Sequence, residues 1–321
     1  MDLIYTNANR VDMGVLSSHA LDLSYGAREN DFKLTLGAEE TTLEYGAFIY
    51  IENTEYGGIV DGMKTSSDIE TISYSGRTWH GILNSKVIEP DPGADYLVVS
   101  GDANELLSML IARMGLSALF VAPNTQSGVT VNNYKFHRYC KGYDGIRDML
   151  GDNGAKLRIA WREKAVVLSA EPVTDYTDDP VDGDMAALSV EQHNQKVNHI
   201  ICLGKGNLSE REVIHLYANK FGVIGDSQYY TGLNEISDIY ENVNAESSEE
   251  LRNGGISRLK ELRGNDKAEI SVLEAAERVY DIGDIVGAKE MRTGIVVTAA
   301  VSQKIVKIKN GAIRIEYKAG G

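Results

Sequence analysis

The sequence is poor in cysteine and contains no long apolar run. Its two cysteines, Cys140 and Cys202, are too few for a disulfide framework, so each is expected to be a buried free thiol. No stretch approaches the roughly eighteen apolar residues of a membrane-spanning helix. The opening MDLIYTNANR lacks the basic start and apolar core of a signal peptide, and it predicts a first strand instead. The chain is therefore expected to fold in the cytoplasm without entering a membrane.

Basic residues are also scarce relative to acidic ones. The chain has 32 Lys and Arg against 47 Asp and Glu, which gives a net charge of −15. DNA binding depends mainly on Lys and Arg that neutralise phosphates, so this balance argues against a specific nucleic-acid-binding surface. A negative surface repels DNA, which suits a protein past which DNA must move without sticking.

Recognisable catalytic and metal-binding patterns are missing as well. The six histidines form no HExxH pattern, and the sequence has no dinucleotide fingerprint, Walker motif or nucleophile elbow. His137 and Cys140 lie three residues apart, but nothing specifies the third group and the pocket that a Cys/His dyad needs. His193 and His199 could share one face of a strand, yet zinc would need two further ligands there. We therefore expect no enzyme activity, no cofactor and no metal.

Proline and acidic residues gather in residues 171–185, which carry six acids and two prolines. The run DDPVDGD at 178–184 resembles a calcium loop, but Pro180 stands where the third position needs an oxygen ligand. The twelfth position is Ser189 and not a glutamate. We interpret the segment as a solvated acidic linker, with a weak cation site as the open alternative.

What the chain does contain is enough apolar residues, 43%, to build globular cores. Residues 1–98 alternate short strand-like runs with Gly, Asn and Asp, which predicts an N-terminal β-barrel domain. Residues 99–170 predict a small α/β insert of two helices and a strand pair. Residues 186–321 predict a second β-barrel domain with one helix over 247–263. The expected fold is mainly β with an α+β insert, in which two tube-like β-barrel domains flank the small α/β domain.

Local signals support this division. Asp102 is expected to cap a helix whose apolar face starts at Leu106, and Ser247 with Glu250 fits a capping box for the helix of the last domain. Asn310–Gly311 predicts a tight hairpin. Gly57 and Gly58 stand at a strand entry, where a positive φ or a close backbone approach favours glycine.

Asp281 and Asp284 lie three residues apart in the apolar run ERVYDIGDIVGAK. Such a pair could be an acid/base pair or half of a metal site, and it could equally be the chemistry of a turn. Asp side chains readily bond their own backbone in turns, and Gly283 stands between the two. We favour the turn, which would lead into a strand of the last β domain.

Five segments in order resemble the siphophage tail-hub family, whose members are also called tail-associated or baseplate-hub proteins. In that family a Gly-Arg in a strand precedes a short helix with a buried leucine and an Ile-x-Pro exit. Residues 138–170, 195–206, 242–262 and 279–317 are similar to the insert, the re-entry strand, the C-terminal helix and the closing barrel. The matching positions of the N-terminal segment are Gly76, Arg77, Trp79, Leu83, Ile88 and Pro90.

The resemblance implies a structural role in the tip or baseplate of a phage or prophage tail. Three chains would form a ring that continues the tail tube, beside the distal tail protein, the tape-measure protein and the receptor-binding proteins. The chain would be made in the cytoplasm of the bacterial host and then reside in the virion tail. Many relatives continue into a hydrolase or a receptor-binding module, and no built-in hydrolase is expected here. A tail-tip module that binds carbohydrate and a cell-wall hydrolase remain the alternatives.

Overall fold

The computed structural model describes residues 2–37, 39–65, 70–178, 186–191, 196–219, 223–245, 247–263, 267–273, 278–289, 294, 296–309 and 311–320. The chain forms two compact units: Met1–Leu188 with Glu269–Gly321, and Ser189–Ala268. The first unit therefore contains both ends of the sequence. Among the described residues, no helix is both long and apolar enough to cross a membrane.

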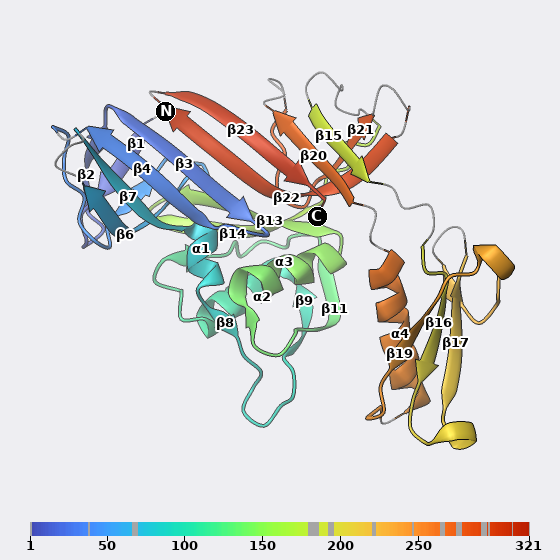
Figure 1. Ribbon diagram of the computed structural model, residues 1–321. Coiled ribbons are helices and arrows are strands. Elements are labelled where there is room, and N and C mark those ends of the chain that lie inside the picture. Colours follow the sequence, from blue (N-terminus) through green and yellow to red (C-terminus); the bar gives the residue numbers. More distant parts are fainter. Residues whose placement is uncertain are drawn as a thin grey trace. The chain divides into compact units, whose positions relative to one another are not determined.

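One large sheet dominates the first unit (Figure 1). Among the described residues it joins strands in the order β15-β20-β23-β22-β3-β4-β7-β6-β5-β1-β2, and β21 pairs with β22. The strands are β1 (Leu3–Thr6), β2 (Asp12–Leu16), β3 (His19–Gly26), β4 (Asp31–Gly37), β5 (Phe48–Tyr50), β6 (Gly57–Thr65), β7 (Thr71–Thr78), β15 (Ala186–Glu191), β20 (Lys267–Leu273), β21 (Ile285–Lys289), β22 (Val296–Lys309) and β23 (Ala312–Ala319).

The pairing of β22 with β3 joins the two ends of the chain in one sheet, and the two tube-like β-barrel domains stay a prediction. The two strands are antiparallel from Gln303–Gly26 to Lys309–Ala20, so the last strands continue the N-terminal sheet. Two apolar clusters line this sheet, and β22 contributes to both through Val306 and Val301. The described pairings follow an open path and do not close a barrel. The compact units do not coincide with the four expected segments, whose role as domains stays a prediction.

The hairpin between β22 and β23 follows the expected pattern. Lys309 pairs with Ala312, which leaves a two-residue turn, and Gly311 has a φ of 82°. Asn310 itself lies outside the described residues. Val306, Ile308 and Tyr317 are buried, whereas Lys307 and Lys309 are exposed, as the alternation predicts.

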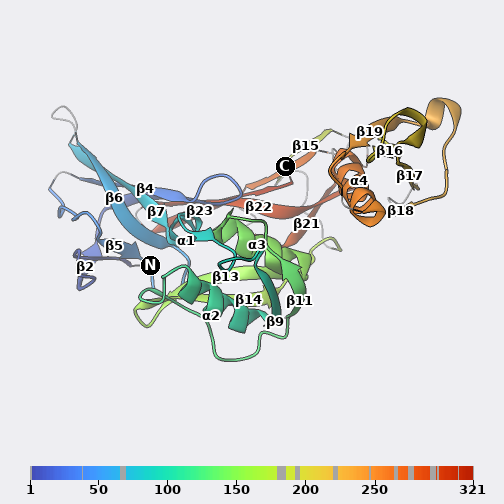
Figure 2. The ribbon, with the colours of Figure 1, turned by 90° about the horizontal axis from the view of Figure 1, so that it is seen from below.

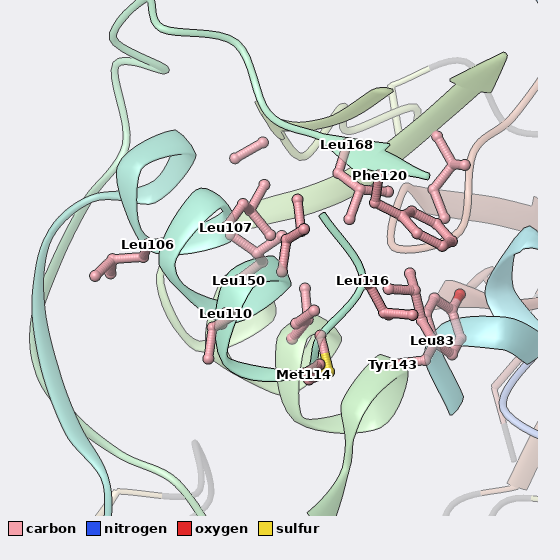
Figure 3. Packing of buried hydrophobic residues seen from close by; sticks show 14 of the residues in the cluster. Leu83, Leu106, Leu107, Leu110, Met114, Leu116, Phe120, Tyr143, Leu150 and Leu168 are labelled. Atoms are coloured by element: carbon pink, nitrogen blue, oxygen red, sulfur yellow. The ribbon is translucent and has the colours of Figure 1, made fainter. Parts of the chain in front are cut away.

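The α/β insert, with α2 and α3, and the preceding helix α1 pack together with short strands on one side of the large sheet (Figure 2). Figure 3 shows α2 leucines meeting Leu150 of α3 and Leu168 of β14. Asp102 caps α2 by accepting a hydrogen bond from the Asn104 amide at 2.9 Å, as predicted. The elements are α1 (Trp79–Asn84), β8 (Val87–Ile88), β9 (Val98–Asp102), α2 (Ala103–Arg113), β10 (Phe120–Val121), β11 (Thr130–Lys135), β12 (Cys140–Lys141), α3 (Gly142–Asp152), β13 (Ala155–Arg162) and β14 (Ala165–Pro172).

The second unit is a four-stranded sheet, in the order β18-β17-β16-β19, with one helix on one face. The helix expected over 247–263 is α4, and its Glu250 amide donates to the Ser247 hydroxyl at 3.2 Å. A Cβ on Gly255 would lie 2.2 Å from the Cys202 sulfur, so glycine at this position of α4 leaves room for the Cys202 side chain of the sheet. The elements are β16 (His199–Leu203), η1 (Leu208–Glu210), β17 (Val213–Ala218), β18 (Ile224–Gly225), η2 (Gly232–Asn234), β19 (Ser237–Glu241) and α4 (Ser248–Arg263).

Candidate functional site: a glycine crossing and a buried charge network

Gly57, Gly58 and Gly76, which the sequence singled out, lie on the paired strands β6 and β7. Gly57 opens β6, and a Cβ there would lie 2.6 Å from the Ile49 carbonyl oxygen. A Cβ on Gly58 would lie 2.2 Å from the Arg77 carbonyl oxygen, and one on Gly76 would lie 1.9 Å from the Ile59 carbonyl oxygen. Real side chains do not tolerate such distances, so close backbone approach, and not a positive φ, requires glycine here.

Trp79 fills the space that Gly57 leaves, since a Cβ there would lie 2.8 Å from Trp79 Cζ2, and it connects the large sheet to the insert. Its ring is fully buried and stacks on Trp161 of β13, with ring centroids 5.3 Å apart. The edge of Phe48 from β5 meets the same ring at 5.6 Å. Thr78 starts α1 by accepting a hydrogen bond from the Gly81 amide at 3.3 Å, which fixes where Trp79 enters the core.

Arg77 forms a two-pronged ion pair with Asp61 at a β-bulge. The register of β6 against β7 shifts between Val60 and Gly62, so Asp61 is the extra residue of the bulge. The Arg77 Nε and Nη2 atoms each lie 2.7 Å from an Asp61 oxygen, and the Arg77 amide donates to Asp61 Oδ2 at 3.0 Å. The Arg77 hydrogen bonds hold the pKa of Asp61 below its usual value.

Asp281 and Asp284 form the expected turn and also bind a lysine from the insert. Gly283 has a φ of 100°, and the Asp281 amide donates to Asp284 Oδ2 at 2.8 Å. The Lys156 ammonium lies 2.8 Å from Asp284 Oδ1 and 2.9 Å from Asp281 Oδ2. The Thr174 amide also donates to Asp284 Oδ1, at 2.9 Å. The turn of the C-terminal region is therefore tied to β13 and to the chain that leaves β14.

The electrostatics of this network favour the charged state of both partners. Burial would lower the pKa of Lys156, but hydrogen bonds to Asp284 and Asp281 outweigh burial and raise it. Burial likewise opposes ionisation of Asp281, yet Lys156 holds the Asp281 pKa below its ordinary value. Lys156 is 5% exposed and Asp284 is 1% exposed, so the pair is shielded from solvent.

A second buried cation, Lys304 of β22, joins β22 to the loop before β6. Its Nζ lies 2.6 Å from Glu55 Oε1, and that pair raises the Lys304 pKa despite burial. His80 of α1 lies beside it, with Nε2 3.8 Å from Glu55 Oε2, and its ring stacks on Tyr25 at 4.5 Å. Burial lowers the pKa of His80 to about 4, so its imidazole is neutral at pH 7.

A cavity of about 280 Å³ lies between the two ion-pair groups and is lined by Glu55, His80, Arg158, Asp281 and Lys304 among others. Its charges are matched within the lining: Lys304 with Glu55, and Arg158 with Asp281 at 3.2 Å. In the described part of the chain, no three His, Cys, Asp or Glu side chains are placed to surround one metal ion. The ion pairs of this region hold together chain segments that are far apart in the sequence.

The remaining sequence candidates do not join this site. Burial raises the pKa of the Cys140 thiol, which disfavours the thiolate that a nucleophilic cysteine needs. Cys202 is buried in the second unit, as expected of a plain thiol. His193 and most of the acidic run 178–184 lie outside the described residues.

Sequence reasoning missed the cations and the histidine of this site. Lys156 shares its strand face with the exposed Arg158, a pattern that places lysine in water, and His80 stands in an apolar helix. Lys304 instead alternates in phase with the buried Val306 and Ile308, so its position in the strand is a buried one, but no local signal marks Glu55 as the partner of Lys304 and His80. The Asp281–Gly283–Asp284 pattern pointed to the turn and not to Lys156.

The buried histidine gives the first unit a specific sensitivity to acid. Because the folded pKa of His80 is depressed to about 4 from an ordinary 6.5, its contribution to stability is complete above pH 6.5. That contribution is lost as the pH falls toward 4, since the unfolded state binds the proton more readily. We expect the free energy of unfolding to fall by about 2–3 kcal/mol between about pH 6.5 and about pH 4.5. Urea titrations across this interval measure it.

The matched variant is His80→Gln, which cannot titrate in this range. Its unfolding free energy is expected to be lower at pH 7, because packing against Tyr25 is lost, but flatter over the same interval. An equally steep profile in this variant would show that another group causes the acid sensitivity.

No protein-family profile matches the chain, and the search of curated sequences finds no similar protein. Solved structures are similar over the whole chain. A tail protein of Neisseria meningitidis MC58 has a TM-score of 0.55 at 11% identity, covering 100% of this chain and 96% of its own. The 43 kDa tail protein of prophage MuSo2 from Shewanella oneidensis has a TM-score of 0.56 at 12% identity, covering 99% and 97%.

A chain in the baseplate of phage P2, in its activated conformation with Ca, is similar as well. It has a TM-score of 0.51 at 10% identity, covering 100% of this chain and 99% of its own. Identities this low show the fold alone. The chain therefore shares a mainly β fold with phage tail and baseplate proteins, along nearly the full length of each.

Proposed function

We propose that this chain is a structural hub subunit of a phage or phage-like tail tip. The observation that carries the proposal is the full-length fold likeness to tail proteins and to a chain of a phage baseplate. In the proposed assembly three copies form a ring that continues the tail tube, so that DNA or cargo passes through its centre. The distal tail, tape-measure and receptor-binding proteins are the proposed neighbours, and the virion tail is the proposed location.

In this ring each chain supplies two tube-like β regions, from the expected segments 1–98 and 186–321, with the insert 99–170 between them. Within the first unit the pairing of β22 with β3 supports this role, because strands from both ends of the sequence share one sheet. The buried network of Lys156 and Lys304 supports it further, since it ties the insert and the last strands to the N-terminal sheet. The net charge of −15 favours free passage of DNA.

Strand β2 offers a surface on which copies could meet. It stands at the end of the described strand path and pairs with β1 along one edge. Met13 and Val15 lie on it and Val11 directly precedes it, and these three side chains are 57%, 56% and 51% exposed for Val11, Met13 and Val15. The register against β1 shifts at Met13, which is the extra residue of a bulge. An edge strand with exposed apolar side chains is a ready template for pairing with another chain.

The mass of the protein in solution tests the proposal, measured by light scattering for the chain alone and mixed with the tail protein encoded beside it. We expect a trimer, or a ring in the mixture, and we expect Met13→Lys with Val15→Lys to abolish it. Met63→Lys is the matched control, because Met63 is 57% exposed on the interior strand β6. A monomer under every condition would contradict the proposal.

Two alternative functions predict different experimental results. A carbohydrate-binding tail module would use exposed tyrosines such as Tyr229, which is 53% exposed, and would bind glycans on an array. A cell-wall hydrolase would clear peptidoglycan in a zymogram and lose that activity in a Cys140→Ala variant. Glycan binding or clearing by a chain that stays monomeric would replace the structural assignment.

A further inference from the structure

Two histidines meet on the face of the second unit's sheet that α4 does not cover. Ile200 and Cys202 of β16 point into the core with α4, so His199 lies on the opposite face. His199 pairs directly with Tyr217 of β17, and His215 lies two residues earlier on the same face. The His199 Nε2 and His215 Nδ1 atoms are 2.9 Å apart. His199 is buried and His215 is exposed, so solvent reaches the pair from the His215 side.

Neighbouring side chains fix the orientation of the His199 ring. Glu235 Oε1 lies 2.8 Å from His199 Nδ1, and the Ser237 hydroxyl lies 2.9 Å from the same nitrogen. Gln228 donates to that Glu235 oxygen at 3.1 Å, which holds the carboxylate in place. Tyr217 stacks on the His199 ring with centroids 4.4 Å apart. With its Nδ1 proton donated to a carboxylate, His199 directs an unprotonated Nε2 toward His215.

We propose that His199 Nε2 and His215 Nδ1 chelate one divalent transition-metal ion of the class that prefers imidazole, namely Ni²⁺, Cu²⁺ or Zn²⁺. Carboxylate–histidine–metal arrangements use the outer group in the same way, to fix the tautomer and orientation of the ligand. The two histidines supply two ligands, and water supplies the rest. The sequence predicted no metal. It gave no sign of this site because the second ligand comes from the neighbouring strand.

The distance between the two nitrogens fits this chemistry. Metal–nitrogen bonds of about 2.05 Å at a right angle place two ligand atoms about 2.9 Å apart, and a tetrahedral angle places them about 3.4 Å apart. The observed 2.9 Å is the length of a hydrogen bond in which the two nitrogens face each other, between rings that lie nearly parallel with centroids 5.1 Å apart. Metal binding replaces this hydrogen bond and turns both rings so that the two nitrogens face the ion. The separation itself suits square-planar or octahedral ions, and Zn²⁺ requires a small opening. For binding, the proton on His215 Nδ1 transfers through solvent to His215 Nε2, so the ring stays neutral and no net proton is released.

The test is calorimetric titration of the full chain, without a purification tag, with NiCl₂ and with ZnCl₂ at pH 7.5. We expect one ion bound per chain. The variant His215→Gln is expected to abolish this binding, and Glu235→Gln is expected to weaken it about 10–100-fold, because the orienting carboxylate is lost. The control is His137→Gln, which removes an exposed histidine of the first unit and is expected to leave binding unchanged.

A second measurement separates ligation from a merely structural role. Imidazole ¹⁵N shifts of His199 and His215 are expected to move together on addition of Zn²⁺, while those of the other histidines stay fixed. Binding that survives His215→Gln, or that falls equally in His137→Gln, would overturn the proposal. So would the absence of any saturable binding by the folded wild-type chain. None of these outcomes depends on whether the protein forms a ring.

Discussion

Replacing Lys156 with methionine is expected to lower the free energy of unfolding of the first unit by about 3–5 kcal/mol. The ammonium contacts both Asp284 oxygens, at 2.8 and 2.9 Å, and one Asp281 oxygen. Methionine keeps the length of the side chain but leaves the carboxylate of Asp284, which is 1% exposed, without its cation. The cost of an uncompensated buried charge is then the main effect. Urea unfolding at pH 7, followed through tryptophan fluorescence, measures it, since Trp79 and Trp161 both lie in this unit.

The matched control is Arg158→Gln in the same strand. Arg158 also contacts Asp281, at 3.2 Å, but its side chain is 47% exposed, and exposed ion pairs contribute at most about 1 kcal/mol. The large effect should therefore belong to Lys156 alone. If the two variants were equally stable, the buried network would not be what ties the turn at Asp281–Asp284 to the insert.

Gly76→Ala is expected to destabilise the large sheet by roughly 3 kcal/mol or more. This is at or above the upper end of the range of about 1–3 kcal/mol that is typical of overpacking. A single methyl group would lie 1.9 Å from the Ile59 carbonyl oxygen and 2.8 Å from Phe32 Cε1. The first contact cannot be relieved by a rotamer change, because the Ile59 carbonyl belongs to the backbone of the paired strand β6. The strands must separate there, next to the Arg77–Asp61 bulge. The midpoint of thermal unfolding and amide exchange along β6 and β7 report the change.

Gly37→Ala provides the control in the same sheet. Gly37 ends β4, and the nearest atom to an added Cβ, Glu40 Cγ, is 4.0 Å away. This substitution is expected to change stability by about 0.5 kcal/mol or less. A comparable loss in both variants would mean that strand glycines matter here for chain flexibility and not for close approach.

Local features of the fold could be predicted from the sequence. The Asp102 cap, the apolar face of α2, the two-residue turn before β23 and the extent of α4 all depend on residues within a few positions of one another. Their signals are periodicity, capping and turn chemistry, which act over one or two turns of chain. The turn at Asp281–Asp284 belongs to the same group.

Long-range features could not be predicted in this way. Lys156 and Asp284 are separated by 128 residues, and Lys304 and Glu55 by 249. The alternating pattern of β13 places Lys156 in solvent, and the pattern of β22 places Lys304 on the buried face without indicating which carboxylate pairs with it. The pairing of β22 with β3 could not be predicted for the same reason, because it is a choice between strand edges that no local pattern encodes. The meeting of His199 with His215 depends on strand register, which is likewise set by the whole sheet.

The pairing of β22 with β3 also has a consequence for synthesis on the ribosome. Ser24 and Gln303, joined by a hydrogen bond, are 279 residues apart. At about 5–20 residues per second, the partner of β3 emerges on the order of tens of seconds after β3 itself. During that interval the N-terminal strands present an unpaired edge, and the insert and the second unit are made before it is covered. Nascent chains of this protein are therefore expected to need protection from aggregation for most of their translation, and a slow, late folding step should appear only when residues 303–309 have left the exit tunnel.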